Sequence, residues 1–233
     1  MTIIFFHIPK SGGTSLGRFL QSQYEQDDIL TIHKQNGTSL EEFQEFDEAK
    51  RNSYRLIKGH RTFGLHQHIS HQVSYFSMIR NPVDRCLSAY YFVKEQRNHW
   101  LHEEYASSDD IRDFMDKSYD DKGQLFNTQT RIFALVGIKK ANLFSEDELL
   151  GRAIKNIDKH FSFIGLTERY EESLQSLCEL YGWKYYIDRK KHNKTKSRPQ
   201  INHLERSTIE KLEEKNRLDI ELYNYVEKKF FKP

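Results

Sequence analysis

The first twenty residues constrain the fold of this chain more than any other stretch. Residues 2–6 read TIIFF, a wholly apolar run of β-branched and aromatic side chains that is typical of a strand buried on both faces. Gly12 and Gly13 follow, and residues 16–20 then carry apolar side chains at helical spacing. The order strand, glycine turn, helix predicts an α/β fold with this turn at the edge of a parallel sheet.

The turn has the composition of a phosphate-binding loop. Glycine lets the backbone approach an anion closely and adopt positive φ, and the helix that follows adds free N–H groups and the positive end of its dipole. A lysine and three hydroxyl groups surround the glycines, which favours an anion site over a turn with incidental hydroxyls. The candidate cofactor-binding residues of this loop are Lys10, Ser11, Gly12, Gly13, Thr14 and Ser15.

A second candidate phosphate site lies at residues 80–91, which read RNPVDRCLSAYY. Residues 73–80 have the pattern of a strand, and Asn81 and Pro82 suit the N-cap and first position of a helix. Arg80 therefore ends a strand and Ser88 lies two turns into the next helix, an arrangement that suits a terminal phosphate. Taken alone, this stretch favours the alternative in which Arg80 pairs with a carboxylate and Ser88 is an ordinary helix residue.

The remainder of the chain alternates strands with helices and becomes richer in helices in its second half. We expect strands at 29–32, 54–60, 161–166 and 183–187, and helices at 39–51, 109–117, 124–135, 145–157, 168–181 (capped by Thr167) and 205–231. This pattern predicts an α/β fold: a P-loop-like parallel β-sheet flanked by helices, followed by a helix-rich half. No repeat or low-complexity linker interrupts residues 1–233, so we expect a single domain.

Composition excludes several classes of protein. A net charge of +2 gives no overall basic surface, so we expect no nucleic-acid partner. The two cysteines, Cys86 and Cys178, predict neither a disulfide framework nor a zinc site. No stretch has the length of a membrane span and no signal peptide precedes the first strand, so we expect a cytoplasmic protein without a membrane span. The oligomeric state is left open.

Both phosphate motifs resemble those of sulfotransferases that use 3′-phosphoadenosine 5′-phosphosulfate (PAPS). Residues 7–15, HIPKSGGTS, are similar to the 5′-phosphosulfate loop of the heparan sulfate 2-O- and 6-O-sulfotransferases, which usually reads HIPKTGGT. Ser11 replaces the threonine and keeps the hydroxyl. Residues 80–91 resemble the 3′-phosphate motif of the same family, and further similarity at 127–131, 163–174 and 193–196 leaves only 98–123 unmatched. The resemblance implies PAPS as sulfuryl donor and a carbohydrate hydroxyl as acceptor, and we expect no metal cofactor.

Sulfuryl transfer requires a base near the acceptor hydroxyl and a cation near the leaving phosphate. Lys10 is the candidate cation, as in the family it resembles. His60 is the candidate base, because it ends a predicted strand after Gly59 and the family's base lies in a similar Gly-His segment. A histidine that only caps the strand by hydrogen bonds is the alternative. His7 is expected to be structural, and the histidines at 66, 68 and 71 have no nearby acid or cysteine to complete a metal site.

Two further groups of residues complete the predicted site. The basic loop 189–198 alone is typical of a solvated or nucleic-acid-binding segment, but it resembles the family's late nucleotide-covering loop. This assigns Lys194, Thr195 and Lys196 to the cofactor. The candidate acceptor-binding residues are Arg61, Trp100, Asn127, Gln129 and Arg131, because arginines and an aromatic ring suit an anionic sugar.

The sequence therefore predicts a sulfotransferase that moves a sulfuryl group from PAPS to a hydroxyl of a glycan or similar acceptor. One alternative is a P-loop kinase that uses ATP, although the lysine precedes the glycines and no magnesium-binding carboxylate is evident. The other alternative is a non-catalytic module that binds a nucleotide or an anionic glycan. The presence of both Lys10 and His60 counts against that alternative, and the identity of the acceptor is left open.

Overall fold

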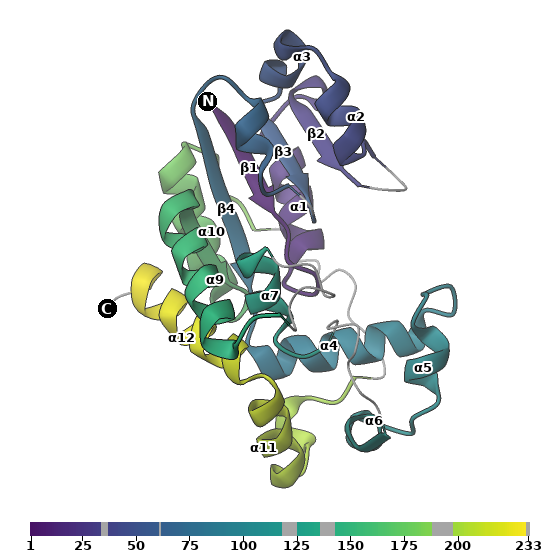
Figure 1. Cartoon of the computed structure of the whole chain (residues 1–233). Coiled ribbons are helices and arrows are strands. Elements are labelled where there is room, and N and C mark those ends of the chain that lie inside the picture. Colours follow the sequence, from purple (N-terminus) through teal and green to yellow (C-terminus); the bar gives the residue numbers. More distant parts are fainter. Residues whose placement is uncertain (34–36, 61, 118–124, 136–142, 188–197, 232–233) are drawn as a thin grey trace. The chain divides into compact units, whose positions relative to one another are not determined.

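The computed structural model describes residues 1–33, 37–60, 62–117, 125–135, 143–187 and 198–231 (Figure 1). The chain divides into two compact units, each assembled from two separate segments. Unit 1 comprises residues 1–79 and 158–192, and unit 2 comprises residues 80–157 and 193–233. Two compact units can belong to one domain or to two, so the single domain over residues 1–233 stays a prediction.

Unit 1 is built on a five-stranded sheet, and the predicted parallel arrangement is confirmed. The strands are β1 (Thr2–Phe6), β2 (Ile29–Ile32), β3 (Leu56–Gly59), β4 (Val73–Ile79) and β5 (Phe161–Leu166). Their order is β2-β3-β1-β4-β5, and every neighbouring pair is parallel. All five residues of β1 are buried, as expected for a central strand. Because Phe6 lies opposite both Gly59 and Ser77, the chain leaves β1, β3 and β4 at one edge of the sheet.

The helices of unit 1 follow from local capping signals. They are α1 (Gly13–Gln21), α2 (Leu40–Glu45), α3 (Glu48–Ser53) and α10 (Tyr170–Tyr181). Ser39 and Glu42 form the capping box that was expected before α2. The single helix predicted over 39–51 was wrong, because Phe46 is extended and the carboxylate of Asp47 accepts the Lys50 N–H to begin α3.

Two other local predictions in unit 1 were wrong. Thr167 does not cap α10, because its hydroxyl donates to the carbonyl of Ile79 at 2.8 Å and the helix begins at Tyr170. Residues 183–187 form no strand; the ring of Trp183 packs instead against Tyr181, with ring centroids 4.8 Å apart. Gly182 ends α10 in the left-handed conformation (φ 70°), as predicted.

Unit 2 is helical throughout the part of it that the structure describes. Its helices are α4 (Pro82–Glu95), α5 (His102–Ala106), α6 (Ile111–Lys117), α7 (Thr128–Ala134), most of α9 (Glu146–His160), α11 (Arg206–Lys215) and α12 (Arg217–Phe230). The single helix predicted over 205–231 was wrong, because Asn216 interrupts it and its side-chain amide donates to the Leu212 carbonyl.

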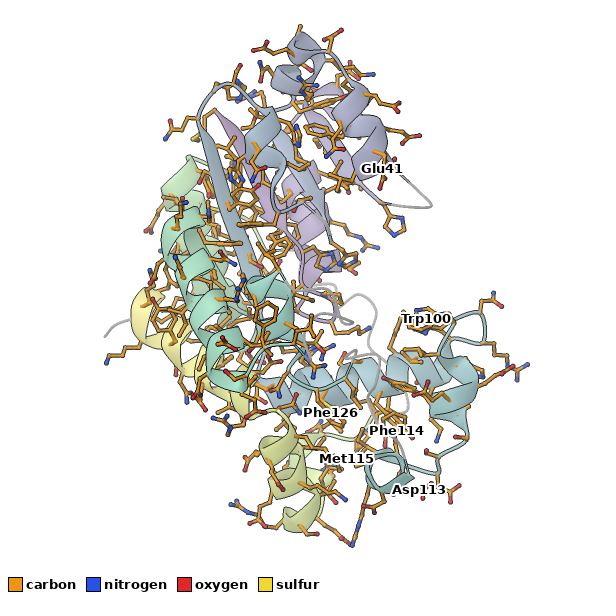
Figure 2. The ribbon with its side chains drawn as sticks, in the orientation of Figure 1. Glu41, Trp100, Asp113, Phe114, Met115 and Phe126 are labelled. Atoms are coloured by element: carbon orange, nitrogen blue, oxygen red, sulfur yellow. The ribbon has the colours of Figure 1, made fainter. Side chains whose placement is uncertain are left out.

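Aromatic side chains fill the core of unit 2. Phe114 is fully buried, and its ring centroid lies 4.5 Å from that of Tyr105 and 5.3 Å from that of Tyr90. Met115 and Phe126 belong to the same buried cluster, and Figure 2 labels these two side chains together with Phe114. Across the described ranges of the chain, no helix combines the length and the apolar character that a membrane span requires.

We expect Gly165→Ala to destabilise the protein, because β5 has no space for a side chain at this position. A Cβ atom at Gly165 would lie 2.4 Å from Met78 Sδ and 2.8 Å from Ser173 Cβ. Overpacking of this kind costs about 1–3 kcal/mol, which urea denaturation measures as a lower free energy of unfolding.

Gly151→Ala is the matched control for this test. Gly151 lies in α9, and a Cβ atom there would meet no heavy atom within 4 Å. Alanine is favoured over glycine within a helix by up to about 1 kcal/mol, so this variant should be as stable as the wild type or more stable. Equal stability of the two variants would contradict the tight packing of Gly165.

Candidate active site

The loop between β1 and α1 has a backbone suited to an anion. Lys10 and Gly12 both adopt left-handed φ values, of 69° and 76°. Gly13 does not; it is the first residue of α1, so the expectation that both glycines supply positive φ is corrected. Holding a lysine in this region costs about 1–2 kcal/mol, and left-handed residues in a turn direct neighbouring N–H groups toward a common point.

Gly13 is required for a steric reason rather than a conformational one. A Cβ atom at Gly13 would lie 1.7 Å from Nε2 of His7, so the imidazole fills the space of the missing side chain. The His7 ring also stacks on Phe5, with centroids 5.4 Å apart, and on His60, with centroids 4.2 Å apart. Burial, reinforced by the charges of His60, Lys58 and Lys10, lowers the pKa of His7 to about 3. His7 is therefore neutral at pH 7, which supports its expected structural role.

His60 lies at the same sheet edge as this loop, directly after β3. Its Nδ1 is 2.9 Å from the carbonyl oxygen of His7. Because a carbonyl oxygen only accepts hydrogen bonds, Nδ1 carries the proton and the neutral ring keeps its lone pair on Nε2. Desolvation lowers the pKa of His60, although its hydrogen bond to His7 acts in the opposite direction. The geometry thus gives His60 a neutral ring whose Nε2 can accept a proton.

Two hydroxyl groups fix the strand ends beneath the loop, and neither was identified from the sequence. Ser77 donates to the carbonyl of Phe6 at 2.6 Å, which ties β4 to the end of β1. Thr167 binds the carbonyl of Ile79, and its methyl group lies 3.6 Å from the place a Cβ of Gly12 would occupy. A serine within an otherwise apolar strand was the available signal for Ser77. No neighbouring residue indicated that Thr167 would bond across the sheet rather than cap its helix.

In unit 2, Arg80 is paired with a carboxylate. Its Nε donates to Oδ2 of Asp84 at 2.6 Å, and the guanidinium of Arg198 binds the same carboxylate. Asn81 caps α4 as predicted, by accepting the Asp84 N–H at 3.1 Å. Ser88 is buried, one turn beyond Asp84 on the same face of α4. The pairing weighed as an alternative for Arg80 is therefore present, and an anion bound here would compete with Asp84 for both arginines.

Gln129 holds the main chain of Arg80. Its Oε1 accepts the Arg80 N–H and its Nε2 donates to the Arg80 carbonyl, each at 2.9 Å. Gln129 is fully buried, and both ends of its amide are used by these bonds. The residue was predicted to bind the acceptor; the structure instead places its side chain where it positions Arg80.

The helix that carries Gln129 is held by Asp219, a residue that was not predicted from the sequence. The fully buried carboxylate of Asp219, on α12, accepts the N–H groups of Gln129 at 3.1 Å and Thr130 at 2.7 Å. Burial raises the pKa of Asp219, and the hydrogen bonds from Thr130 and Gln129 oppose this shift. Asn127, another predicted acceptor residue, is buried and accepts the Asp219 N–H at 3.2 Å. Asn127 thus also stabilises the interior of unit 2, by a hydrogen bond to the main chain of α12.

The other predicted residues are placed as follows. Trp100 is 66% exposed, stacks on His99 and is labelled in Figure 2; Arg131 is half-buried, and its buried Nε has no hydrogen-bond partner in the described part of unit 2. In the loop of unit 1, Ser11 is buried, Ser15 is half-buried and Thr14 is exposed. Four predicted site residues lie outside the described residues: Arg61, Lys194, Thr195 and Lys196.

The cluster of histidines after β3 is used structurally. His66 Nδ1 is 3.1 Å from the hydroxyl of Tyr75, and His71 Nε2 is 2.8 Å from the hydroxyl of Thr2. Over the described ranges, no group of three or more His, Cys, Asp or Glu side chains is arranged to hold a metal ion.

The family model and the curated relatives match nearly the whole chain. The model of the Sulfotransferase family matches residues 1–226. The chain is 26% identical over 275 residues to heparan-sulfate 6-O-sulfotransferase 3 of Mus musculus and equally to that of Homo sapiens, covering 98% of this chain and 57% of each relative. It therefore spans little more than half the length of these curated relatives. The crystal structure of mouse sulfotransferase SULT7A1 complexed with PAP is similar with a TM-score of 0.45 and 18% identity, covering 79% of this chain and 59% of that one.

If Arg80 binds a 3′-phosphate, as the sequence predicts, Gln129→Ala should loosen Arg80 and so reduce the preference for 3′-phosphoadenosine 5′-phosphate (PAP) over AMP, which lacks only the 3′-phosphate. Two hydrogen bonds to the Arg80 main chain are lost, so the preference should fall about tenfold while AMP affinity is retained. Isothermal titration calorimetry measures both affinities. Gln175→Ala, on the exposed surface of α10, is the matched control. An unchanged preference in Gln129→Ala would rule out this positioning role.

Proposed function

Because the chain belongs to the sulfotransferase family, we propose that it transfers a sulfuryl group from PAPS to a hydroxyl group of a carbohydrate acceptor. The single observation that carries this proposal is the junction of the β1–α1 loop with His60. The anion-binding backbone and a neutral imidazole share one support, since His7 fills the space of Gly13 and accepts a hydrogen bond from His60. The relatives named heparan-sulfate 6-O-sulfotransferase 3 support a glycan as acceptor.

In this proposal, the loop of unit 1 binds the 5′-phosphosulfate of PAPS. The first N–H groups of α1 have no partner within the helix, and we assign them to the anion together with the side chains of Ser11, Thr14 and Ser15. Arg80 and Ser88 bind the 3′-phosphate, with Gln129 fixing the main chain of Arg80. The segment that contains Lys194, Thr195 and Lys196 is proposed to cover the nucleotide.

The proposed reaction is an in-line substitution at sulfur. Nε2 of His60 accepts the proton of the acceptor hydroxyl while the hydroxyl oxygen forms a bond to sulfur. The bond between sulfur and the bridging oxygen of the 5′-phosphate breaks, and the electron pair stays on that oxygen. Lys10 stabilises this growing charge. PAPS supplies the sulfuryl group, and the products are a sulfate ester, PAP and protonated His60.

We expect PAP to bind at least tenfold more tightly than AMP. Arg80 supplies charge-assisted hydrogen bonds to the 3′-phosphate, and each such bond contributes about 1.5–3 kcal/mol. Calorimetry should show this preference in the wild type and its loss in Arg80→Gln. Arg55→Gln removes an exposed arginine that pairs with Asp28 in unit 1 and should leave both affinities unchanged. Equal affinity of the wild type for PAP and AMP would contradict the assignment of the 3′-phosphate site.

We expect His60→Ala to keep its affinity for PAP while the rate of sulfuryl transfer falls by roughly 10²–10⁴-fold. Transfer of radiolabelled sulfate to a panel of glycans measures the rate. His68→Ala removes a histidine of the neighbouring loop and serves as the control. A folded His60→Ala protein with near-normal transfer would eliminate His60 as the base.

The same assignment predicts the dependence of the rate on pH. Only the neutral ring accepts a proton, and desolvation lowers the pKa of His60 below its ordinary value. The wild-type rate should therefore stay level around pH 7 and fall only as the pH drops through this lowered pKa, about tenfold per pH unit below it. A rate that rises on acidification would have the wrong sign for a histidine base.

A further inference from the structure

The N-termini of α7 and α12 meet inside unit 2, and each caps the other. Asn127, the residue before α7, accepts the main-chain N–H of Asp219 at 3.2 Å, and its own N–H donates to Oδ1 of Asn216 at 3.2 Å. In return, the carboxylate of Asp219 accepts the N–H groups of Gln129 and Thr130 and, at 2.8 Å, the hydroxyl of Thr130. All five residues are buried, so water does not compete for these hydrogen bonds.

The negative charge of Asp219 allows these two helix ends to lie together. The N–H groups at the start of every helix carry partial positive charge, so two N-termini in contact repel one another. Asp219 lies in the first turn of α12 and accepts hydrogen bonds from the first turn of α7, so one carboxylate offsets the charge of both ends. The position of α7 on α12 therefore depends on this single side chain.

Through Gln129, the position of α7 determines that of Arg80. The main-chain N–H of Gln129 is bound by Asp219, while its side-chain amide binds both the N–H and the carbonyl of Arg80. The segment before α7 is attached to α4 as well, because Nη1 of Arg85 donates to the carbonyl of Leu125 at 2.8 Å. A continuous series of buried hydrogen bonds thus leads from α12 to the main chain of Arg80.

We propose that Asp219 is a positioning residue for the 3′-phosphate of the donor and acts through Gln129 on Arg80. The inference rests on the proposed function, because it concerns the arginine assigned there to the 3′-phosphate. A guanidinium that is already held in place binds a phosphate without the cost of being ordered. The C-terminal helix α12, on which none of the predicted site residues lies, therefore sets how strongly the protein prefers a nucleotide with a 3′-phosphate.

Asp219→Asn tests this role, because it keeps the size of the side chain, removes the charge and turns N–H groups of its own toward α7. Calorimetry on the full chain should show the preference for PAP over AMP falling about tenfold, with the affinity for AMP unchanged. The double variant of Asp219→Asn with Gln129→Ala should lose no more of this preference than Gln129→Ala alone, because both changes act through the same contact with Arg80.

Val226→Ala separates positioning from a general loss of stability. Val226 is fully buried on α12 but takes no part in the hydrogen bonds between α12 and α7. This variant should unfold at a lower temperature than the wild type, as Asp219→Asn should, and yet keep the wild-type preference for PAP. Glu221→Gln removes an exposed charge from the same helix and should change neither property.

Hydrogen exchange on the wild type tests the same coupling without any substitution in α12. Coupling between two sites is reciprocal, so a 3′-phosphate that holds Arg80 should also hold α7 and the start of α12. The amides of residues 216–222 should therefore exchange more slowly with PAP bound than with AMP bound. Gln129→Ala should remove this difference, because it breaks the contact between α7 and Arg80.

The outcomes separate this inference from the proposed function. Equal affinity of the wild type for PAP and AMP would overturn the 3′-phosphate site itself. Where the wild type prefers PAP, the positioning role alone is overturned if folded Asp219→Asn keeps that preference, if Val226→Ala loses it equally, or if PAP and AMP protect residues 216–222 alike. Should Asp219→Asn fail to fold, the exchange measurement on the wild type decides the question.

Discussion

Parallel pairing of β1 with β3 and β4 is the constraint on which the rest of unit 1 depends. The register places Phe6 opposite Gly59 on one side and Ser77 on the other. The chain therefore leaves all three strands at the same edge of the sheet, and the residues that follow β1 and β3 meet there. A slip of one residue in β3 would turn Lys58 to the opposite face and separate His60 from His7. The chemistry at this edge is thus a product of strand register as much as of the loop sequence.

His7 connects β3 to the loop between β1 and α1. Its N–H donates to the Gly59 carbonyl at 2.9 Å, and its own carbonyl accepts a hydrogen bond from His60. The ring meanwhile occupies the space that any side chain at position 13 would need. One residue thus sets the distance between the phosphate-type loop and the candidate base.

Features that depend on neighbouring residues could be predicted from the sequence. The apolar β-branched runs identified four of the five strands closely, and the caps at Ser39 and Asn81 were found because their partners lie three residues away. The meeting of the loop with His60 followed from the rule that parallel strands end at one edge. The breaks at Phe46 and Asn216 were missed because the apolar residues keep helical spacing across both positions. The helical backbone itself stops at each of them.

Features that depend on distant partners could not be predicted. The N–H groups at the start of α7 are capped by Asp219, 90 residues beyond Gln129. The hydroxyl of Thr167 donates to the carbonyl of Ile79, 88 residues away, instead of capping α10. Gln129 was predicted to bind the acceptor because a sequence does not distinguish an exposed glutamine from a buried one.

The interleaving of the two units has a consequence for how the chain is made. Strands β1 to β4 are complete at residue 79, but β4 receives its outer neighbour only when β5 is synthesised at 161–166. At about 5–20 residues per second, translation of the intervening segment takes on the order of ten seconds. Throughout that time a nascent sheet would present β4, six of whose seven residues are buried in the finished protein, as an unpaired edge. Chaperone protection of this edge therefore matters most while residues 80–160 are being synthesised, and slow translation of that segment would prolong the exposure. A fragment ending before residue 161 would carry the same edge permanently.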